Sequence, residues 1–175
     1  MIKTIILAID PALTTTGYSI FQIKNKTYIQ LEYGRFKLDN NLNYFDRIIT
    51  VKVQLDKLLS KYKITDVVIE DIHYQARSGI KVYKKLAQMQ FYLLYYFFNL
   101  QICTSLVQVN SWRHLVCKFY GLENAKKSTW YKFICNEMIV TDIDNNTADA
   151  IGIGIWKYIN LTNLSLSINK DIFVD

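Results

Sequence analysis

Apolar and polar positions follow two different periods along this chain, and the change of period separates strands from helices. Five segments have the pattern of strands: Ile5 to Ile9, Gly17 to Lys24, Tyr28 to Lys37, Asp66 to Glu70, and Thr104 to Val109. The first is a continuous apolar run, which predicts a strand covered on both faces. The second and third are separated by two polar residues and predict an antiparallel hairpin.

Helical periods separate and follow these strands. Apolar residues recur with helical spacing over residues 40–62, 78–99, 126–138 and 146–159, and a short helix is expected from Asn110. The first helix would carry one broad apolar face made of Phe45, Ile48, Ile49, Leu55, Leu58 and Leu59. Its segment IITVKVQL also alternates as a strand would. The order of elements predicts an α/β fold, a mixed β-sheet with helices on both faces.

Composition narrows the class of protein. No repeat, low-complexity tract or linker divides the chain, so we expect a single domain over residues 1–175. A net charge of +6 favours a polyanionic partner. Cys103, Cys117 and Cys135 lack CxxC spacing and are interpreted as reduced core thiols. The apolar stretch QFYLLYYFFNLQIC is shorter than the roughly 20 residues that span a bilayer, and the N-terminus lacks a signal-peptide pattern, so we expect a cytoplasmic protein.

Two of the predicted strands end in a carboxylate. Asp10 follows the apolar run IILAI, and Glu70 closes the run DVVIE. The C-terminal ends of strands in such a sheet share one edge, where ligand sites gather. A third acid, Asp149, stands early in the last predicted helix. Small residues around it would let that helix approach the sheet closely: Ala148, Ala150, Gly152 and Gly154.

Three carboxylates at one edge repel one another, and divalent cations relieve that repulsion. An all-oxygen set of ligands suits Mg²⁺ or Mn²⁺, and two such ions are the usual apparatus for cleaving a phosphodiester. Asp10 also has a structural interpretation as part of an Asp-Pro turn, and Asp149 as an acid favoured by a helix dipole. Three acids at matching positions favour the metal site over these separate explanations.

These motifs resemble a known family. The stretches DPALTTTGYSI, VVIED and NTADAIGIG, in this order and spacing, resemble the RuvC-type Holliday junction resolvases of the ribonuclease H-like superfamily, especially their smaller phage and Gram-positive relatives. The stretches KKLAQMQ and NSWR extend the resemblance, which runs from Ile5 to about Tyr158. It implies a ribonuclease H-like fold with a five-stranded mixed β-sheet, in a phage- or bacterium-encoded protein inside the host cell.

The resemblance also implies an activity and its residues. Asp10, Glu70 and Asp149 would be the catalytic metal ligands of a magnesium-dependent endonuclease that cleaves Holliday junctions and other branched DNA. Manganese could substitute for magnesium, with two ions in each active site. The active species would be a homodimer that places two sites on a four-way junction, and cleavage would leave 5′-phosphate and 3′-hydroxyl ends.

One position departs from the family pattern. The family often has a second acid three residues before the last one, and here that position is Asn146. An amide oxygen can still bind Mg²⁺, but the site loses one negative charge. Asp142 or Asp144 could supply that charge instead, although both precede the predicted helix. The sequence leaves open which of the three completes the site.

Basic residues near the acids are candidates for binding DNA. Lys81, Lys84, Lys85 and Gln88 have i, i+3, i+4, i+7 spacing, which places them on one stripe of the long helix. Arg77 precedes this stripe and follows Glu70. A second basic patch has aromatic residues interleaved: Lys126, Lys127, Trp130, Tyr131 and Lys132. Such lysines contact phosphates without reading the base sequence, and an ordinary solvated helix face is the alternative.

Several aromatic residues have two open interpretations. His73 or Tyr74 could stack on an unpaired base at the crossover, and Tyr74 could equally pack on the sheet. The apolar face of the long helix could be core or dimer seam: Val82, Leu86, Met89, Leu93 and Phe97. Further aromatic residues on that helix favour a dimer formed through it: Tyr92, Tyr95, Tyr96 and Phe98.

Three other functions compete with this interpretation. An actin-like or sugar-kinase ATPase shares a strand-turn-strand motif, but it needs two such domains and more glycine than the six residues present. A ribonuclease H acting on RNA–DNA hybrids shares the fold and the metals, while the long basic helix and the NTADA motif favour a resolvase. A branched-DNA-binding protein with lapsed catalysis is suggested by Asn146, and the three acids argue against it.

Overall fold

The computed structural model describes residues 4–25, 27–74, 76, 79–122, 127–137 and 143–162 of the 175-residue chain. Five strands form one mixed sheet with the order β3-β2-β1-β4-β5. Their bounds are β1 Thr4–Asp10, β2 Thr15–Lys24, β3 Thr27–Lys37, β4 Asp66–Glu70 and β5 Cys103–Val107. The first three pair antiparallel, and β4 and β5 continue the sheet parallel to β1. The predicted five-stranded mixed sheet is confirmed.

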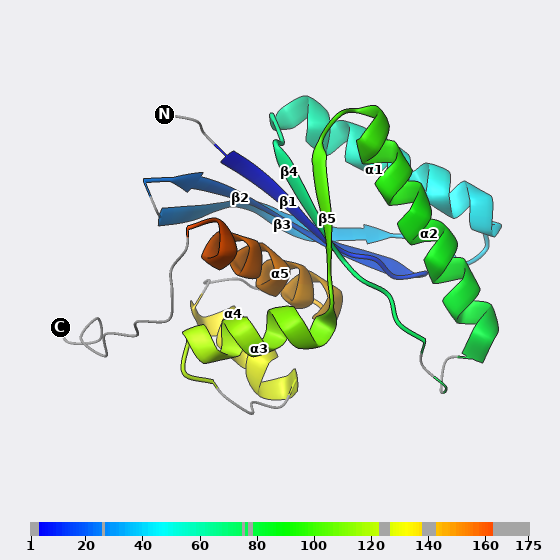
Figure 1. The fold of residues 1–175 in the computed structure, drawn as a ribbon. Coiled ribbons are helices and arrows are strands. Elements are labelled where there is room, and N and C mark those ends of the chain that lie inside the picture. The colour runs from blue at the N-terminus through cyan, green and yellow to red at the C-terminus, as the bar shows by residue number, and fades with distance from the viewer. Residues whose placement is uncertain are drawn as a thin grey trace.

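Helices cover both faces of the sheet, as predicted (Figure 1). Their bounds are α1 Tyr44–Lys61, α2 Gly79–Asn99, α3 Val109–Phe119, α4 Lys127–Glu137 and α5 Asn145–Leu161. α1 and α2 pack on one face, and α5, together with α3 and α4, packs on the other. None of the helices in the described ranges is long and apolar enough to cross a membrane.

The two faces explain why β1 is apolar throughout. Side chains alternate between the faces of a strand, so Ile6 and Ala8 enter the core on the α5 side while Leu7 and Ile9 enter the core under α1 and α2. All four are fully buried. The carboxylate at the end of this strand therefore follows a segment that is held rigidly from both sides.

α5 lies close to the sheet because its inner face carries small residues. A Cβ atom on Gly154 would lie 2.2 Å from the Phe21 ring of β2, which no packed structure tolerates. The Ser19 hydroxyl of β2 donates a hydrogen bond of 2.8 Å to the carbonyl oxygen of Ala150. The close approach predicted for these residues is confirmed, although Gly152 faces Trp112 of α3 rather than the sheet.

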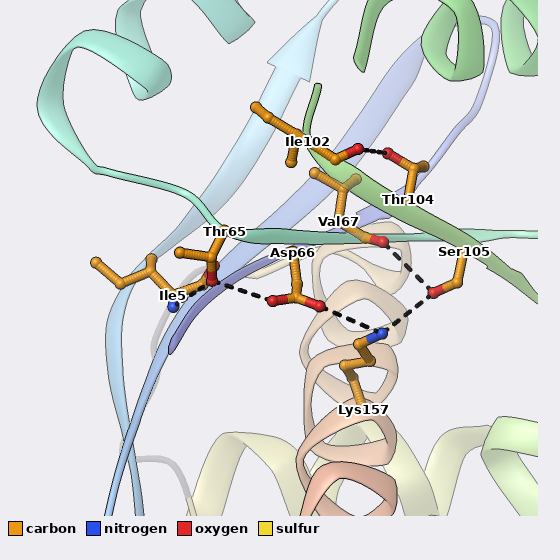
Figure 2. Close-up of polar contacts among 8 residues, drawn as sticks. All are labelled: Ile5, Thr65, Asp66, Val67, Ile102, Thr104, Ser105 and Lys157. Carbon is orange, nitrogen blue, oxygen red and sulfur yellow. Dashed lines mark hydrogen bonds and ion pairs between the residues drawn. The ribbon is translucent and has the colours of Figure 1, made fainter. Parts of the chain in front are cut away.

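A polar network ties the C-terminal half of α5 to the other end of the sheet (Figure 2). Lys157 Nζ lies 3.6 Å from Asp66 Oδ1 and 3.5 Å from the Ser105 hydroxyl. Asp66 also accepts a hydrogen bond of 3.0 Å from the Thr65 hydroxyl, and Ser105 donates to the carbonyl oxygen of Val67. These contacts connect α5, β4 and β5 at the start of the two parallel strands.

Two predictions about burial need correction. The apolar face of α1 is narrower than expected: Ile48 and Leu55 are buried, but the side chains of Phe45 and Ile49 are exposed. These two residues are four positions apart on one side of α1, and no other described element of the chain covers that side. Cys103 is exposed because it begins β5 at the edge of the sheet, whereas Cys117 is buried and burial raises the pKa of its thiol.

Candidate metal centre and nucleic-acid interface

The fold brings the two strand-end acids to one edge and one face of the sheet. Asp10 ends β1 and Glu70 ends β4, and these strands are parallel neighbours. Asp10 has the same parity in its strand as Ala8, and Glu70 has the same parity as Val68. Both therefore belong to the face that α5 covers. Asp10 is buried, with 8% of its surface exposed.

The start of α5 lies against this edge. Gly17 of β2 is the register partner of Asp10, and a Cβ atom there would lie 2.1 Å from the carbonyl oxygen of Asn146. Only glycine allows this approach of helix to strand. Asp149 is the fifth residue of α5, so it lies in the second helical turn, and it is almost completely buried. The three predicted carboxylates thus come together at one edge of the sheet.

A cavity of about 530 Å³ opens at this edge. Glu70 and Asp149 contribute to its wall, but Asp10 does not. Most of the described lining comes from the segment after β4 and from the start of α3: Glu70, Asp71, His73, Gln108, Val109, Asn110, Arg113 and Asp149. The cavity is therefore predominantly polar and carries several acids.

Two consecutive residues of α3 hold two of the acids. Trp112 donates a hydrogen bond of 2.8 Å from Nε1 to Glu70 Oε2. Arg113 Nη2 lies 3.4 Å from Asp149 Oδ1 in an ion pair. The guanidinium carbon of Arg113 lies 4.9 Å from the centre of the Trp112 ring, so the two side chains also contact each other.

The donor chemistry of this edge fits a hard divalent cation. Asp10, Glu70 and Asp149 offer carboxylate oxygens, the ligands that Mg²⁺ and Mn²⁺ prefer. In the arrangement seen here, however, no three His, Cys, Asp or Glu side chains of the described ranges are close enough to share one ion.

Asn146 and Asp144 have different roles at the start of α5. Asn146 donates from Nδ2 to the carbonyl oxygen of Thr15 at 2.5 Å, which leaves its amide oxygen as a possible ligand. Asp144 is the N-cap residue of α5. Its side chain accepts a hydrogen bond of 2.8 Å from the backbone N–H of Thr147 and forms an ion pair with Arg35 at 3.5 Å. The cap occupies Asp144, so Asn146 is the better candidate. Asp142 lies outside the described residues.

Comparison with known proteins identifies the family. A profile of the family described as "Crossover junction endodeoxyribonuclease RuvC" matches residues 6–156. The chain belongs to the RuvC family. The RuvC of Brachyspira hyodysenteriae is 25% identical over 153 residues, covering 86% of this chain and 91% of that protein.

Solved structures share the RuvC fold with this chain. Thermus thermophilus RuvC in complex with a Holliday junction substrate has a TM-score of 0.71 at 12% identity, covering 90% of this chain and 95% of that one. The fowlpox virus resolvase, solved with substrate Holliday junction DNA, has a TM-score of 0.53 at 10% identity, covering 90% and 99%. These likenesses confirm the predicted ribonuclease H-like fold.

The basic stripe predicted for this RuvC-family chain is exposed. Lys81, Lys84 and Lys85 are all exposed on α2, which begins soon after Glu70. Lys85 Nζ also lies 5.9 Å from the centre of the Tyr44 ring. Lys132 of the second patch is exposed on α4. Arg77 and Lys126 lie outside the described residues, as does the side chain of Lys127.

The aromatic candidates separate clearly. Tyr74 is exposed and meets the ring of Tyr83 edge to face at 5.9 Å, so it does not pack on the sheet. His73 lines the cavity. Trp130 contradicts the prediction of an aromatic residue available in the second basic patch: it is fully buried against Trp112, because α4 packs its indole into the core beside α5.

Sequence reasoning gave no role to Arg113 and Asn110, which both line the cavity. A signal for them was present. α3 starts two residues after β5, which is parallel to β4, so the first turn of α3 must lie at the same edge as Glu70. Residues three apart share a helix face, and this rule connects Asn110 with Arg113.

Proposed function

We propose that this chain is a metal-dependent, structure-selective endonuclease that cleaves Holliday junctions and other branched DNA. The observation that carries the proposal is the set of carboxylates Asp10, Glu70 and Asp149, which a RuvC-family fold brings to one edge of the sheet beside a polar cavity. Phosphodiester cleavage by this family of folds needs that combination of acids and space for a DNA backbone.

Each acid has a proposed role as a catalytic metal ligand. Asp10, Glu70 and Asp149 would bind Mg²⁺, with Mn²⁺ as a substitute and two ions per site, and the amide oxygen of Asn146 would complete the set. Bound ions would activate a water molecule and stabilise the charge on the scissile phosphate. The chain itself contributes rigidity, since Asp10 ends a buried strand and Asp149 lies within a buried helix.

Contacts with DNA are proposed for the exposed basic residues. Lys81, Lys84 and Lys85 would bind phosphates on one arm of the junction, because α2 starts near the edge that carries Glu70. Tyr74 is exposed and would stack on an unpaired base. The remaining proposed contacts come from Arg77, Lys126, Lys127 and Lys132.

A homodimer formed through α2 is also proposed. Phe91, Tyr95 and Phe98 are exposed on this helix, and Phe98 has 76% of its surface exposed. Together with Leu94, Ile102 and Thr104 they line a groove of about 370 Å³. Apolar patches of this kind mark interaction surfaces. A dimer with Phe98 at its seam is expected to dissociate in Phe98→Glu, as measured by light scattering after size exclusion.

Two further sequence predictions remain proposals. The chain would act as one nuclease domain over residues 1–175, since a single sheet carries all the described helices. It would act in the cytoplasm, because a junction resolvase works where the DNA is.

The testing experiment compares three substrates. A labelled four-way junction, a matched linear duplex and an RNA–DNA hybrid are incubated with the protein in Mg²⁺, Mn²⁺ or EDTA, beside the Asp149→Asn variant. We expect paired, symmetric nicks in the junction alone, lost in EDTA and in the variant. Ribonuclease H activity would cut the hybrid instead. A lapsed enzyme would bind the junction tightly and cut nothing with either metal.

A further inference from the structure

Arg113 is a cation placed beside a proposed metal ligand. Its Nη2 atom lies 3.4 Å from Asp149 Oδ1, whereas strong charge-assisted hydrogen bonds are about 2.7–2.9 Å long. Asp149 is nearly inaccessible, but the Arg113 side chain is 27% exposed at the cavity. The ion pair is therefore long, and the arginine has room to withdraw while Asp149 stays in place.

The Arg113 side chain also does not make all of its possible hydrogen bonds. Its Nε atom is buried and has no hydrogen-bond partner among the described residues. Burying a charged group with an unmade hydrogen bond opposes the arrangement. The guanidinium is held instead by the face of Trp112, at 4.9 Å, and by one long contact with Asp149. Because these two contacts are weak, a partner that binds the Asp149 carboxylate more strongly can replace the arginine.

Trp112 differs from Arg113 in every one of these respects. It is fully buried between α5 and α4, and its hydrogen bond to Glu70 Oε2 is short, at 2.8 Å. The bond uses one oxygen of the carboxylate, Oε2. A neutral donor also adds no charge that would repel a cation. Trp112 thus orients Glu70 without competing for it.

We propose that Arg113 and a divalent cation compete for Asp149, so that this ion pair sets the metal affinity of the site, while Trp112 positions Glu70 for the ion. The inference rests on the proposed metal site. Arg113 and the cation are both positive and need the same carboxylate, so they exclude each other. Arg113 leaves Asp149 when the ion binds, and the two neighbouring residues of α3 affect metal binding in opposite directions.

The test measures Mn²⁺ binding directly, without DNA and without cleavage. Electron paramagnetic resonance of free Mn²⁺ gives the dissociation constant for the full chain. Arg113→Gln removes the competing charge, so we expect about tenfold tighter binding, comparable to the loss of one weak charge-assisted hydrogen bond. Trp112→Phe removes the donor to Glu70 and should weaken binding about tenfold. Unchanged or weaker binding in Arg113→Gln would overturn the competition.

A matched control separates this pair from a general effect of charge. Arg35 pairs with Asp144 at 3.5 Å at the start of the same helix, so Arg35→Gln removes an equal charge near α5 without touching Asp149. We expect its Mn²⁺ affinity to change less than about twofold. An increase equal to that of Arg113→Gln would assign the effect to net charge and overturn the proposal.

Two more variants keep the outcome interpretable. Thermal unfolding in EDTA checks that each variant folds. If Arg113→Gln does not fold, Arg113→Met replaces it, and we expect the same increase in Mn²⁺ affinity. Asp149→Asn should abolish tight Mn²⁺ binding in both backgrounds. If Asp149→Asn binds Mn²⁺ as well as the wild type does, the proposed metal site is wrong. If it loses binding while the Arg113 variants match the wild type, the competition alone is wrong.

Discussion

The two acids of β4 have the same helix above them and different partners. Asp66 begins the strand and pairs with Lys157 of α5, in a network that Thr65 and Ser105 complete (Figure 2). Glu70 ends the strand and lines a cavity together with Asp149 of α5. One strand and one helix thus support two polar clusters. We call the cluster around Asp66 and Lys157 closed, because its charges pair with each other, and the cluster of Glu70 and Asp149 open, because it lines the cavity.

The geometry of regular structure explains how one helix reaches both acids. Residues 66 and 70 are ~13 Å apart in an extended strand, and residues 149 and 157 are ~12 Å apart along a helix. α5 runs antiparallel to β4, so its early residue meets the end of the strand and its late residue meets the start. The match of lengths requires the close approach that the small residues of α5 permit.

The difference lies in how charge is balanced. Asp66 pairs with one lysine and accepts a hydrogen bond from the Thr65 hydroxyl, so its charge is matched within the protein. The described lining of the cavity contains three acids, Glu70, Asp71 and Asp149, but a single arginine. This excess of negative charge at an open edge is what the proposed cation would balance. A balanced pair at a closed edge stabilises the fold.

Replacing an acid of the proposed metal site should have the largest effect on activity. We expect Asp10→Asn to lower the cleavage rate by about a thousandfold or more, because a lost metal ligand removes several kcal/mol of transition-state stabilisation. Binding to the four-way junction should stay within a few fold of wild type. Single-turnover cleavage and gel-shift titration measure the two quantities.

Asp66→Asn is the matched control for that variant. It removes an acid from the same sheet at the opposite, closed cluster, and it should leave the cleavage rate at saturating Mg²⁺ nearly unchanged. Equal losses in Asp10→Asn and Asp66→Asn would contradict the distinction between the two clusters.

The closed cluster should matter for stability. Lys157→Met leaves Asp66 without its cation, and we expect the free energy of unfolding to fall by roughly 1–3 kcal/mol, less than for a fully buried pair because both side chains retain some exposure. Urea unfolding measures it. Lys52→Met breaks an exposed pair with Asp56 and should lower the free energy of unfolding less than Lys157→Met does. A Lys157→Met variant as stable as Lys52→Met would make the network incidental.

Adding charge to the open cluster should separate metal binding from stability. Asn146→Asp adds a possible ligand charge, so Mn²⁺ should bind about tenfold more tightly. The same change removes the donor to the Thr15 carbonyl oxygen and should lower the free energy of unfolding by about 1–2 kcal/mol. Asn145→Asp adds equal charge at an exposed neighbour and should change neither much. Unchanged Mn²⁺ binding in Asn146→Asp would remove Asn146 from the site.

The smallest expected effect concerns a third acid, which is compensated as Asp66 is. Burial raises the pKa of Glu32, but hydrogen bonds from Lys61, Tyr62 and Tyr18 outweigh it and hold the pKa below its ordinary value of 4.5. A lowered pKa stabilises the fold above pH 4.5, and this stabilisation is lost as the pH falls through the folded-state value.

Glu32→Gln tests this linkage. The variant should be less stable than wild type at pH 7 by under about 1 kcal/mol, and the difference should shrink as the pH falls below 4.5. Urea midpoints across the acid range measure it. A difference that stays constant with pH would show that Glu32 contributes no linked charge.

Much of the fold could be predicted from local patterns. The run DVVIE was assigned to the residues that β4 occupies, and the long helix ends at Asn99 as expected. Exposure was harder to predict. The spacing of apolar residues shows which residues share a face of a helix, but it does not show how much of that face another element covers. Phe45 was placed on the broad apolar face of the first helix and is exposed, while Trp130 was placed within the second basic patch and is buried.

The sequence by itself determined which carboxylates share one edge of the sheet. Asp10 and Glu70 both end apolar strands, and the C-terminal ends of such strands share one edge of a sheet, so the pattern of strands was sufficient. Only the tertiary structure decided what each acid contacts. Trp112 reaches Glu70 across 42 residues of sequence, and Arg113 reaches Asp149 across 36, because packing of α3 beside α5 sets those neighbours. Local patterns carry no information on such distances, since they arise from the packing of whole elements.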